Sequence, residues 1–187
     1  RAGRPGRHGA DRRALLLDCG DPVPHSLFPR WPFRAAPLPP PTTGPDVVVW
    51  AVGDIHGRAD LLAPLLERIL LDLSLSAQSR RMAVFLGDYI DRGLESRRVL
   101  DLLCRLKDHE GLECRFVRGN HDQALLDFLD DPATGAGWSD MGGRETLLAW
   151  RVDPPPARAD GEAWTAAAAA LRAALSDAQL RFLQRLD

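Results

Sequence analysis

Three short polar blocks, each directly after a short apolar run, constrain the fold of this chain more than any other feature. The blocks are GDIHG (53–57), GDYIDRG (87–93) and GNHD (119–122), and the runs before them are residues 47–52, 82–86 and 114–117. Short apolar runs that end in glycine-containing polar turns predict buried strands. Each block therefore places carboxylate, amide or imidazole groups just beyond a strand end, where open α/β sheets build their sites.

Stretches with helical spacing separate the predicted strands. The first crossover helix is expected to bury one face, formed by Leu61, Leu62, Leu65, Leu66, Ile69 and Leu73. The second, over residues 95–107, is expected to bury Val99, Leu102, Leu103 and Leu106. Later helices are expected over residues 123–129, 144–150 and 163–175, and after Ser176, where Gln179 completes a capping box. This alternation predicts an α/β fold with a parallel βαβαβ sheet, followed by a helical segment.

The first 46 residues differ from the rest in composition. They hold ten of the chain's 15 prolines, which break helices and cannot donate to a sheet ladder. We expect residues 1–46 to be a disordered, partly polyproline extension and residues 47–187 to be one folded domain. An SH3-type ligand and an arginine-rich transit segment are the alternatives for the extension, and neither has the right regularity.

Composition limits the class of protein. With 187 residues, 45% of them apolar, the chain can bury a substantial core. The net charge of −2 gives no basic footprint, so no nucleic-acid partner is expected. Cys19, Cys104 and Cys114 are too scattered for a disulfide framework and suggest a reducing compartment. No apolar run approaches the ~20 residues of a membrane span, so no membrane partner is expected and the chain is predicted to be cytoplasmic.

The polar groups in the blocks form a candidate metal-ligand set: Asp54, His56, Asp88 and Asn120. Hard oxygens mixed with imidazole suit two divalent transition ions that share a bridging carboxylate. Two-metal sites of this kind stabilise the attacking and leaving oxygens of a phosphoryl displacement. The sequence therefore predicts a phosphoester hydrolase. The plainer alternative is an Asx-turn at Asp54 with a solvent-facing His56.

The three blocks in this order resemble the calcineurin-like metallophosphoesterase superfamily. The fuller second block, with Asp91-Arg92-Gly93, resembles its serine/threonine phosphoprotein phosphatase branch, in particular the bacterial type. The similarity covers residues 47–153 and includes a stretch with Trp138, Gly142-Gly143 and Thr146-Leu147. The resemblance implies a mixed-sheet sandwich flanked by helices, of which this chain would supply the parallel N-terminal half.

The resemblance also implies roles for single residues. Asp88 would bridge two divalent ions, with Mn preferred over Fe or Zn, and Asn120 would be a neutral ligand to the second ion. Arg92 would bind two phosphate oxygens, with Asn120 and Arg118 as further phosphate contacts. For Arg118 a salt bridge at the edge of the core is an equal alternative.

In the same scheme a hydroxide activated by the two metals attacks the phosphorus atom. His121 protonates the leaving oxygen as general acid, and Asp91 fixes its tautomer. A metal-ligand role is the alternative for His121. The expected substrates are a phosphoprotein or a small phosphoester. Trp138 and Trp150 are expected to be packing residues.

The chain also departs from the family pattern, because no histidine follows His121. Family members complete the second metal site with two later histidines, so that site would keep only Asp88 and Asn120. We expect a truncated chain without full activity in preference to a degenerate paralogue.

Two alternative functions stay open. Asp122, where many eukaryotic members have Glu, also occurs in symmetrical diadenosine tetraphosphate hydrolases. Those enzymes often lack an acid at the position of Asp91, which favours the phosphatase. A non-enzymatic, metal-binding interaction module is the alternative from another class.

Overall fold

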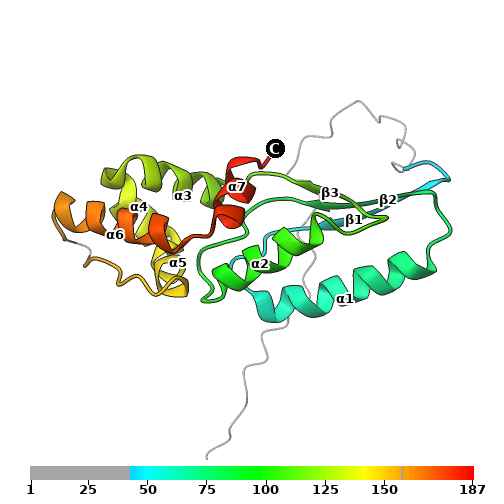
Figure 1. The fold of residues 1–187 in the computed structure, drawn as a ribbon, viewed down its shortest axis with the longest axis horizontal. Coiled ribbons are helices and arrows are strands. Elements are labelled where there is room, and N and C mark those ends of the chain that lie inside the picture. The colour runs from blue at the N-terminus through cyan, green and yellow to red at the C-terminus, as the bar shows by residue number, and fades with distance from the viewer. Residues whose placement is uncertain (1–42, 157) are drawn as a thin grey trace, which may run out of the picture. The chain divides into compact units, whose positions relative to one another are not determined.

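The computed structural model describes residues 43–156 and 158–187, which belong to one compact unit (Figure 1). The predicted disorder of the N-terminal extension concerns residues 1–46, and residues 1–42 lie outside the described part. Asp46, the last residue of that predicted extension, accepts a hydrogen bond from the backbone N–H of Ser79 at 2.9 Å. This contact joins the start of the first strand to the turn before the second.

The sheet has three parallel strands in the order β1-β2-β3, as the sequence predicts. They are β1 (Val47–Val52), β2 (Arg80–Phe85) and β3 (Glu113–Phe116). Val52 pairs with Phe85, and Phe85 pairs with Phe116. Because these residues end their strands in register, all three polar blocks leave the sheet at the same edge.

Helices α1 (Ala59–Leu75) and α2 (Ser96–Leu106) connect the strands and lie along one face of the sheet (Figure 1). The predicted buried face of α2 is confirmed at Val99, Leu103 and Leu106. The prediction for α1 is partly wrong, because Leu61 and Leu65 are 58% and 41% exposed.

The buried residues of α1 follow the spacing of a narrow stripe instead: Ala59, Leu62, Leu66, Ile69 and Leu73. Leu61 and Leu65 come one position before Leu62 and Leu66. One position is a rotation of about 100° around the helix axis, which turns the Leu61 and Leu65 side chains away from the sheet.

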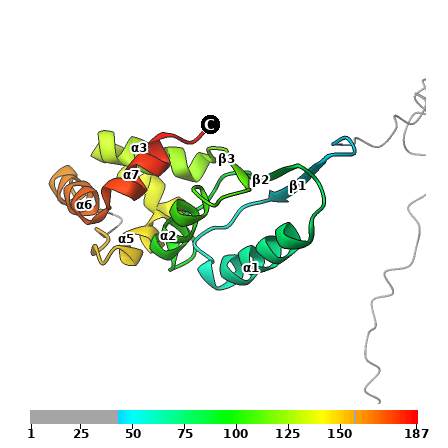
Figure 2. The same ribbon diagram turned by 45° about the vertical axis from the view of Figure 1, so that its right-hand side comes forward.

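Seven further helical elements follow β3 among the described residues, and α3 to α6 gather beyond the carboxyl ends of the strands (Figure 2). They are α3 (Asn120–Asp130), α4 (Gly135–Trp138), the π-turn η3 (Ser139–Gly143), α5 (Arg144–Ala149), α6 (Gly161–Ala174) and α7 (Asp177–Gln184), with a 3₁₀ turn, Pro132–Thr134, before α4. Helix α3 begins at Asn120, three residues earlier than predicted, so the third polar block forms its first turn. The predicted capping box of α7 is confirmed, since Ser176 and Gln179 exchange hydrogen bonds of 3.0 and 3.2 Å.

Sequence reasoning does not predict α4 and η3, because both elements are short and rich in glycine. Tertiary packing forms them: the Trp138 ring stacks on Phe128 with ring centroids 4.8 Å apart. A side chain at Gly135 would collide with Phe128 and Trp164.

Helix α7 brings the chain back to the sheet. Phe182 packs against Phe116 and Tyr89, with ring centroids 4.9 and 5.8 Å apart. Beyond α7, the Asp187 N–H donates to Phe116 O, and Asp187 O accepts from the Arg118 N–H, both at 2.9 Å. No helix among the described residues is long and apolar enough to span a membrane.

Candidate metal and phosphate site

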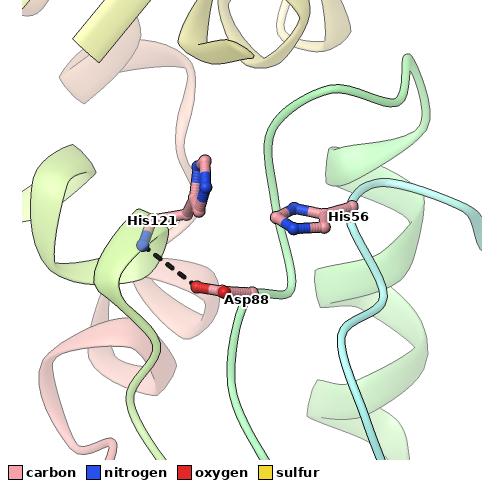
Figure 3. Close-up of side chains that lie close together, drawn as sticks. All are labelled: His56, Asp88 and His121. Carbon is pink, nitrogen blue, oxygen red and sulfur yellow. Dashed lines mark hydrogen bonds between the residues drawn. The ribbon is translucent and has the colours of Figure 1, made fainter. Parts of the chain in front are cut away.

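The three polar blocks bring His56, Asp88 and His121 together. One donor atom from each lies within 4.8 Å of the others. Figure 3 shows that they come from the loop after β1, the loop after β2 and the start of α3. The structure therefore forms one group from residues that are up to 65 positions apart in the sequence.

The backbone around His56 orients its ring. The His56 N–H donates to Asp88 O at 2.8 Å, which joins the first block to the second. Ring atom Nδ1 lies 2.9 Å from Ile90 O. Since a carbonyl only accepts, Nδ1 carries the proton and Nε2 presents a lone pair. A carbonyl that fixes the tautomer of a histidine is the usual support of a metal ligand. Gly57 has φ +63°, and any side chain there would collide with Gly93 O.

Asp54, the other predicted ligand of the first block, lies beside this ring. Its Oδ2 is 3.9 Å from His56 Nε2, and its side chain is 65% exposed. Asn120 is exposed at the first position of α3. Both side chains are thus open to solvent, and neither belongs to the group of His56, Asp88 and His121.

Asp88 and the third block hold each other in place. The His121 N–H donates to Asp88 Oδ1 at 3.0 Å (Figure 3). Gly119 permits this approach, because a Cβ there would overlap the Asp88 carboxylate. Asp88 itself has φ +53°, an uncommon conformation for a residue with a side chain. Such strain persists only where surrounding contacts determine it, and it concentrates at functional sites.

Asp122 ties the second and third blocks together, a role that sequence reasoning missed. Its buried carboxylate accepts backbone N–H groups from Asp88 and Gly119 at 2.9 Å and from Tyr89 at 3.1 Å. Burial raises the pKa of the Asp122 carboxyl to about 6. The hydrogen bonds from the three N–H groups act in the opposite direction and lower this pKa, but burial has the larger effect. The available signal was its place as the third residue of a helix that starts after Gly119, where an acid reaches back to the cap.

His121 and Asp91 form the buried pair that the family resemblance implies. His121 Nδ1 lies 2.8 Å from Asp91 Oδ2, and the two side chains are 3% and 0% exposed. Trp138 Nε1 donates to the same oxygen at 2.8 Å, and Thr146 Oγ1 donates to Oδ1 at 2.6 Å. Burial raises the pKa of the Asp91 carboxyl, and these hydrogen bonds oppose the shift. Trp138 therefore does more than pack, contrary to the sequence expectation.

The two arginines with predicted phosphate roles differ. A guanidinium nitrogen of Arg92 lies 3.2 Å from His121 Nε2, at the donor group. The guanidinium of Arg118 donates instead to Gln123 Oε1 at 2.9 Å and to the carbonyls of Gln184 and Leu186 at 3.2 Å. These bonds hold the end of α7 and the residues after it to α3, so they favour a structural role for Arg118, made by neutral acceptors in place of the expected salt bridge.

The donors present fit a divalent transition ion. His56 Nε2 has a free lone pair, Asp88 and Asp54 supply anionic oxygens, and mixed nitrogen and oxygen ligands suit Mn, Fe or Zn. His121 is the third member of the group, so the geometry alone also permits it to be a ligand.

The chain is similar to curated proteins over part of its length. It is 37% identical over 78 residues to the symmetrical bis(5'-nucleosyl)-tetraphosphatases of Xanthomonas campestris and Xylella fastidiosa. The match covers 42% of this chain but only 21% and 24% of those two proteins. Among solved structures, a cold-active protein tyrosine phosphatase is 20% identical with a TM-score of 0.35, over 66% of this chain and 40% of that one.

A family model describes most of the domain. The model for the calcineurin-like phosphoesterases matches residues 47–172. This range contains the whole sheet and all three polar blocks, and it agrees with the α/β fold described above. The chain belongs to the calcineurin-like phosphoesterase family.

Proposed function

We propose that this chain carries the metal- and phosphate-binding residues of a hydrolase that cleaves dinucleoside tetraphosphates symmetrically. The observation that carries the proposal is the convergence of His56, Asp88 and His121 at the carboxyl edge of the sheet, with Arg92 beside them. The resemblance to symmetrical bis(5'-nucleosyl)-tetraphosphatases supports the substrate class.

In this proposal each block contributes separate ligands. Asp54, His56 and Asp88 hold one divalent ion, and Asp88 with Asn120 contributes to a second. Such ions polarise the phosphoryl group and lower the pKa of coordinated water. Asp88 would serve both ions, because an ionised carboxylate has about four lone-pair positions and the His121 N–H engages only one of its oxygens.

Arg92 and His121 act on the substrate in the same proposal. The planar guanidinium of Arg92 binds two phosphate oxygens, a geometry that lysine does not provide. His121 would donate from Nε2 to the leaving oxygen when its ring carries a proton on both nitrogens, and Asp91 fixes the ring orientation through the 2.8 Å contact at Nδ1.

Serine/threonine phosphoprotein phosphatase is the second candidate, and the buried Asp91–His121 pair favours it. An alkoxide leaving group needs a proton, whereas a nucleoside diphosphate leaves readily without one. A general acid fixed by a buried carboxylate is therefore more valuable for phosphoserine than for a phosphoanhydride.

The test compares substrates on the purified chain. With Mn²⁺ present, diadenosine tetraphosphate, a phosphoserine peptide and p-nitrophenyl phosphate are assayed side by side. We expect diadenosine tetraphosphate to be consumed fastest, with ADP as the nucleotide product. Equal amounts of AMP and ATP would contradict symmetrical cleavage, and preferential turnover of the peptide would favour the second candidate. No turnover of any substrate would contradict the proposed function of this chain.

A pair of arginine variants tests the phosphate role. Arg92→Ala should lower kcat/KM at least tenfold, because it removes a charge-assisted contact to phosphate. Arg98→Ala is the matched control, since Arg98 on α2 is also exposed and its ion pair among the described residues is with Glu95, just before that helix. Equal effects of the two substitutions would remove Arg92 from the site.

A further inference from the structure

The 138–146 segment, which runs from Trp138 through η3 into α5, contacts the second polar block at several points. Trp138 and Thr146 donate to the two carboxylate oxygens of Asp91. Gly142 O accepts from the Arg92 N–H at 3.0 Å. One segment about fifty residues away therefore holds both the residue that contacts His121 and the predicted phosphate ligand.

The backbone of the second block depends on these contacts. Asp91 and Arg92 are consecutive residues with φ +70° and +65°, the left-handed region that residues with side chains seldom adopt. Their N–H groups are both bound by the 138–146 segment: Asp91 N–H by Thr146 Oγ1 at 2.9 Å and Arg92 N–H by Gly142 O. A strained conformation is retained only where neighbouring groups determine it.

The single hydroxyl of Thr146 makes two hydrogen bonds with Asp91, one to its backbone and one to its side chain. Its oxygen accepts the Asp91 N–H, and its proton goes to Asp91 Oδ1 at 2.6 Å. A hydroxyl has one proton and two lone pairs, so both bonds can form together. Thr146 is fully buried, as is its neighbour Ser96, whose Oγ lies 3.3 Å away. Water therefore does not replace the hydroxyl when it is removed.

The glycines of the segment make this approach sterically feasible. Gly142 has φ +115°, and a Cβ there would lie 2.8 Å from Arg92 Cγ and 2.9 Å from Arg92 N. A Cβ at Gly143 would collide with the Trp138 ring. Larger residues would move the segment away from the second block.

We propose that Thr146 and Trp138 are positioning residues, which fix the Asp91 carboxylate and through it the orientation and tautomer of the His121 ring. Trp138 shares Asp91 Oδ2 with His121 Nδ1, so the oxygen that orients the imidazole is itself held by the indole N–H. The kinetic consequence rests on the proposed function, but the effect on the ring does not require turnover.

The test reads the His121 ring directly. The full, metal-free chain with ¹⁵N-labelled histidine gives ring nitrogen and proton signals for five histidines, and His121→Asn assigns those of His121. In the unmodified chain we expect a single tautomer with the proton on Nδ1, bound to Asp91. Thr146→Val keeps the side-chain shape but removes the hydroxyl. Thr146→Val should lower the ratio of the Nδ1-protonated to the Nε2-protonated tautomer of His121 roughly tenfold. The reason is the loss of the buried hydrogen bond from the Thr146 hydroxyl to the Asp91 carboxylate.

Two further variants and one control separate positioning from packing. Thr146→Ser restores the hydroxyl and should restore the single tautomer. Trp138→Phe keeps a ring on Phe128 but loses the indole N–H, and should shift the ratio in the same direction as Thr146→Val. Trp150→Phe removes a buried indole N–H that donates to Gln179 Oε1 at 3.4 Å, and should leave His121 unchanged. If Thr146→Val does not fold, the comparison of Trp138→Phe with Trp150→Phe decides.

The outcomes distinguish this inference from the proposed function. An unchanged His121 spectrum in Thr146→Val and Trp138→Phe would overturn the inference and make both residues ordinary core residues, whatever the chain hydrolyses. The expected shifts in a chain without any turnover would support the inference and contradict the proposed function. If turnover is present, Thr146→Val should lower kcat with little change in KM, since the positioned group acts on the leaving oxygen.

Discussion

The backbone N–H of His121 donates to Oδ1 of Asp88 at 3.0 Å, and the next residue, Asp122, accepts the backbone N–H of Asp88 at 2.9 Å. The second and third blocks are thus bound in both directions by the first turn of α3. The protein contacts alone assemble the donor group, so the site should be largely formed before any ion binds.

Asp122→Asn should destabilise the domain more than an ordinary polar substitution. The asparagine side chain has one acceptor oxygen, so it cannot serve the three N–H groups of Asp88, Tyr89 and Gly119, and its NH₂ group would face one of them. We expect a loss of about 2 kcal/mol in urea unfolding of the metal-free chain. Asp127→Asn is the control on the same helix, where an exposed carboxylate accepts a hydrogen bond from the Gln123 side chain. A loss of equal size in both variants would contradict the tie between the blocks.

The pH dependence of stability should carry the signature of Asp122. Its pKa in the folded chain is raised to about 6 from the ordinary aspartate value of about 3.9, so the folded chain binds the extra proton more tightly than the unfolded chain. The resulting stabilisation is complete below pH 4 and is lost as the pH rises through 6, by up to about 3 kcal/mol. Metal-free unmodified chain and Asp122→Asn are compared by urea unfolding from pH 4 to 7. A difference between the two that stays flat over this range would show that the pKa is not raised.

The arrangement of strands could be predicted from sequence because the signal is local. Each apolar run ends at a polar block, and the structure places all three strand ends in register. The buried face of α1 was predicted too wide, because Leu61 and Leu65 adjoin the stripe of Leu62 and Leu66. The stripe of Leu61 and Leu65 continues into the charged residues Arg68 and Asp72, which is the sequence signal that it faces solvent.

This assignment gives a matched pair of leucine substitutions. Leu62→Ala removes a side chain that is 2% exposed and should cost about 3 kcal/mol of unfolding free energy. Leu61→Ala, one residue away on the same helix, removes a side chain that is 58% exposed and should change stability by less than about 0.5 kcal/mol. Thermal or urea unfolding of both variants measures the difference. Similar losses would mean that the exposed face of α1 is covered in solution.

The site divides in the same way between local and distant signals. The block residues Asp54, His56 and Asp88 are recognisable because each directly follows a strand. Thr146 and Trp138 carried no such signal, since their contacts with Asp91 span 55 and 47 residues and depend on the path of η3. The orientation of Arg118 was equally unpredictable, because its carbonyl partners lie in the last residues of the chain.

Substitutions of Asp88 and His121 should differ in kind, because only Asp88 is proposed to be a metal ligand. Asp88→Asn removes the anionic oxygens of the proposed bridge and should weaken Mn²⁺ binding at least tenfold in a calorimetric titration. His121→Asn should keep Mn²⁺ affinity near normal, since its Nδ1 faces Asp91 and its Nε2 faces Arg92.

Where the chain turns substrates over, His121→Asn should slow phosphoserine hydrolysis far more than p-nitrophenyl phosphate hydrolysis, because nitrophenolate leaves without a proton. Asp91→Asn should show a milder form of the same selectivity. If His121→Asn instead abolishes Mn²⁺ binding, His121 is a ligand, as its place within 4.8 Å of the other donors permits, and the general acid must be another group.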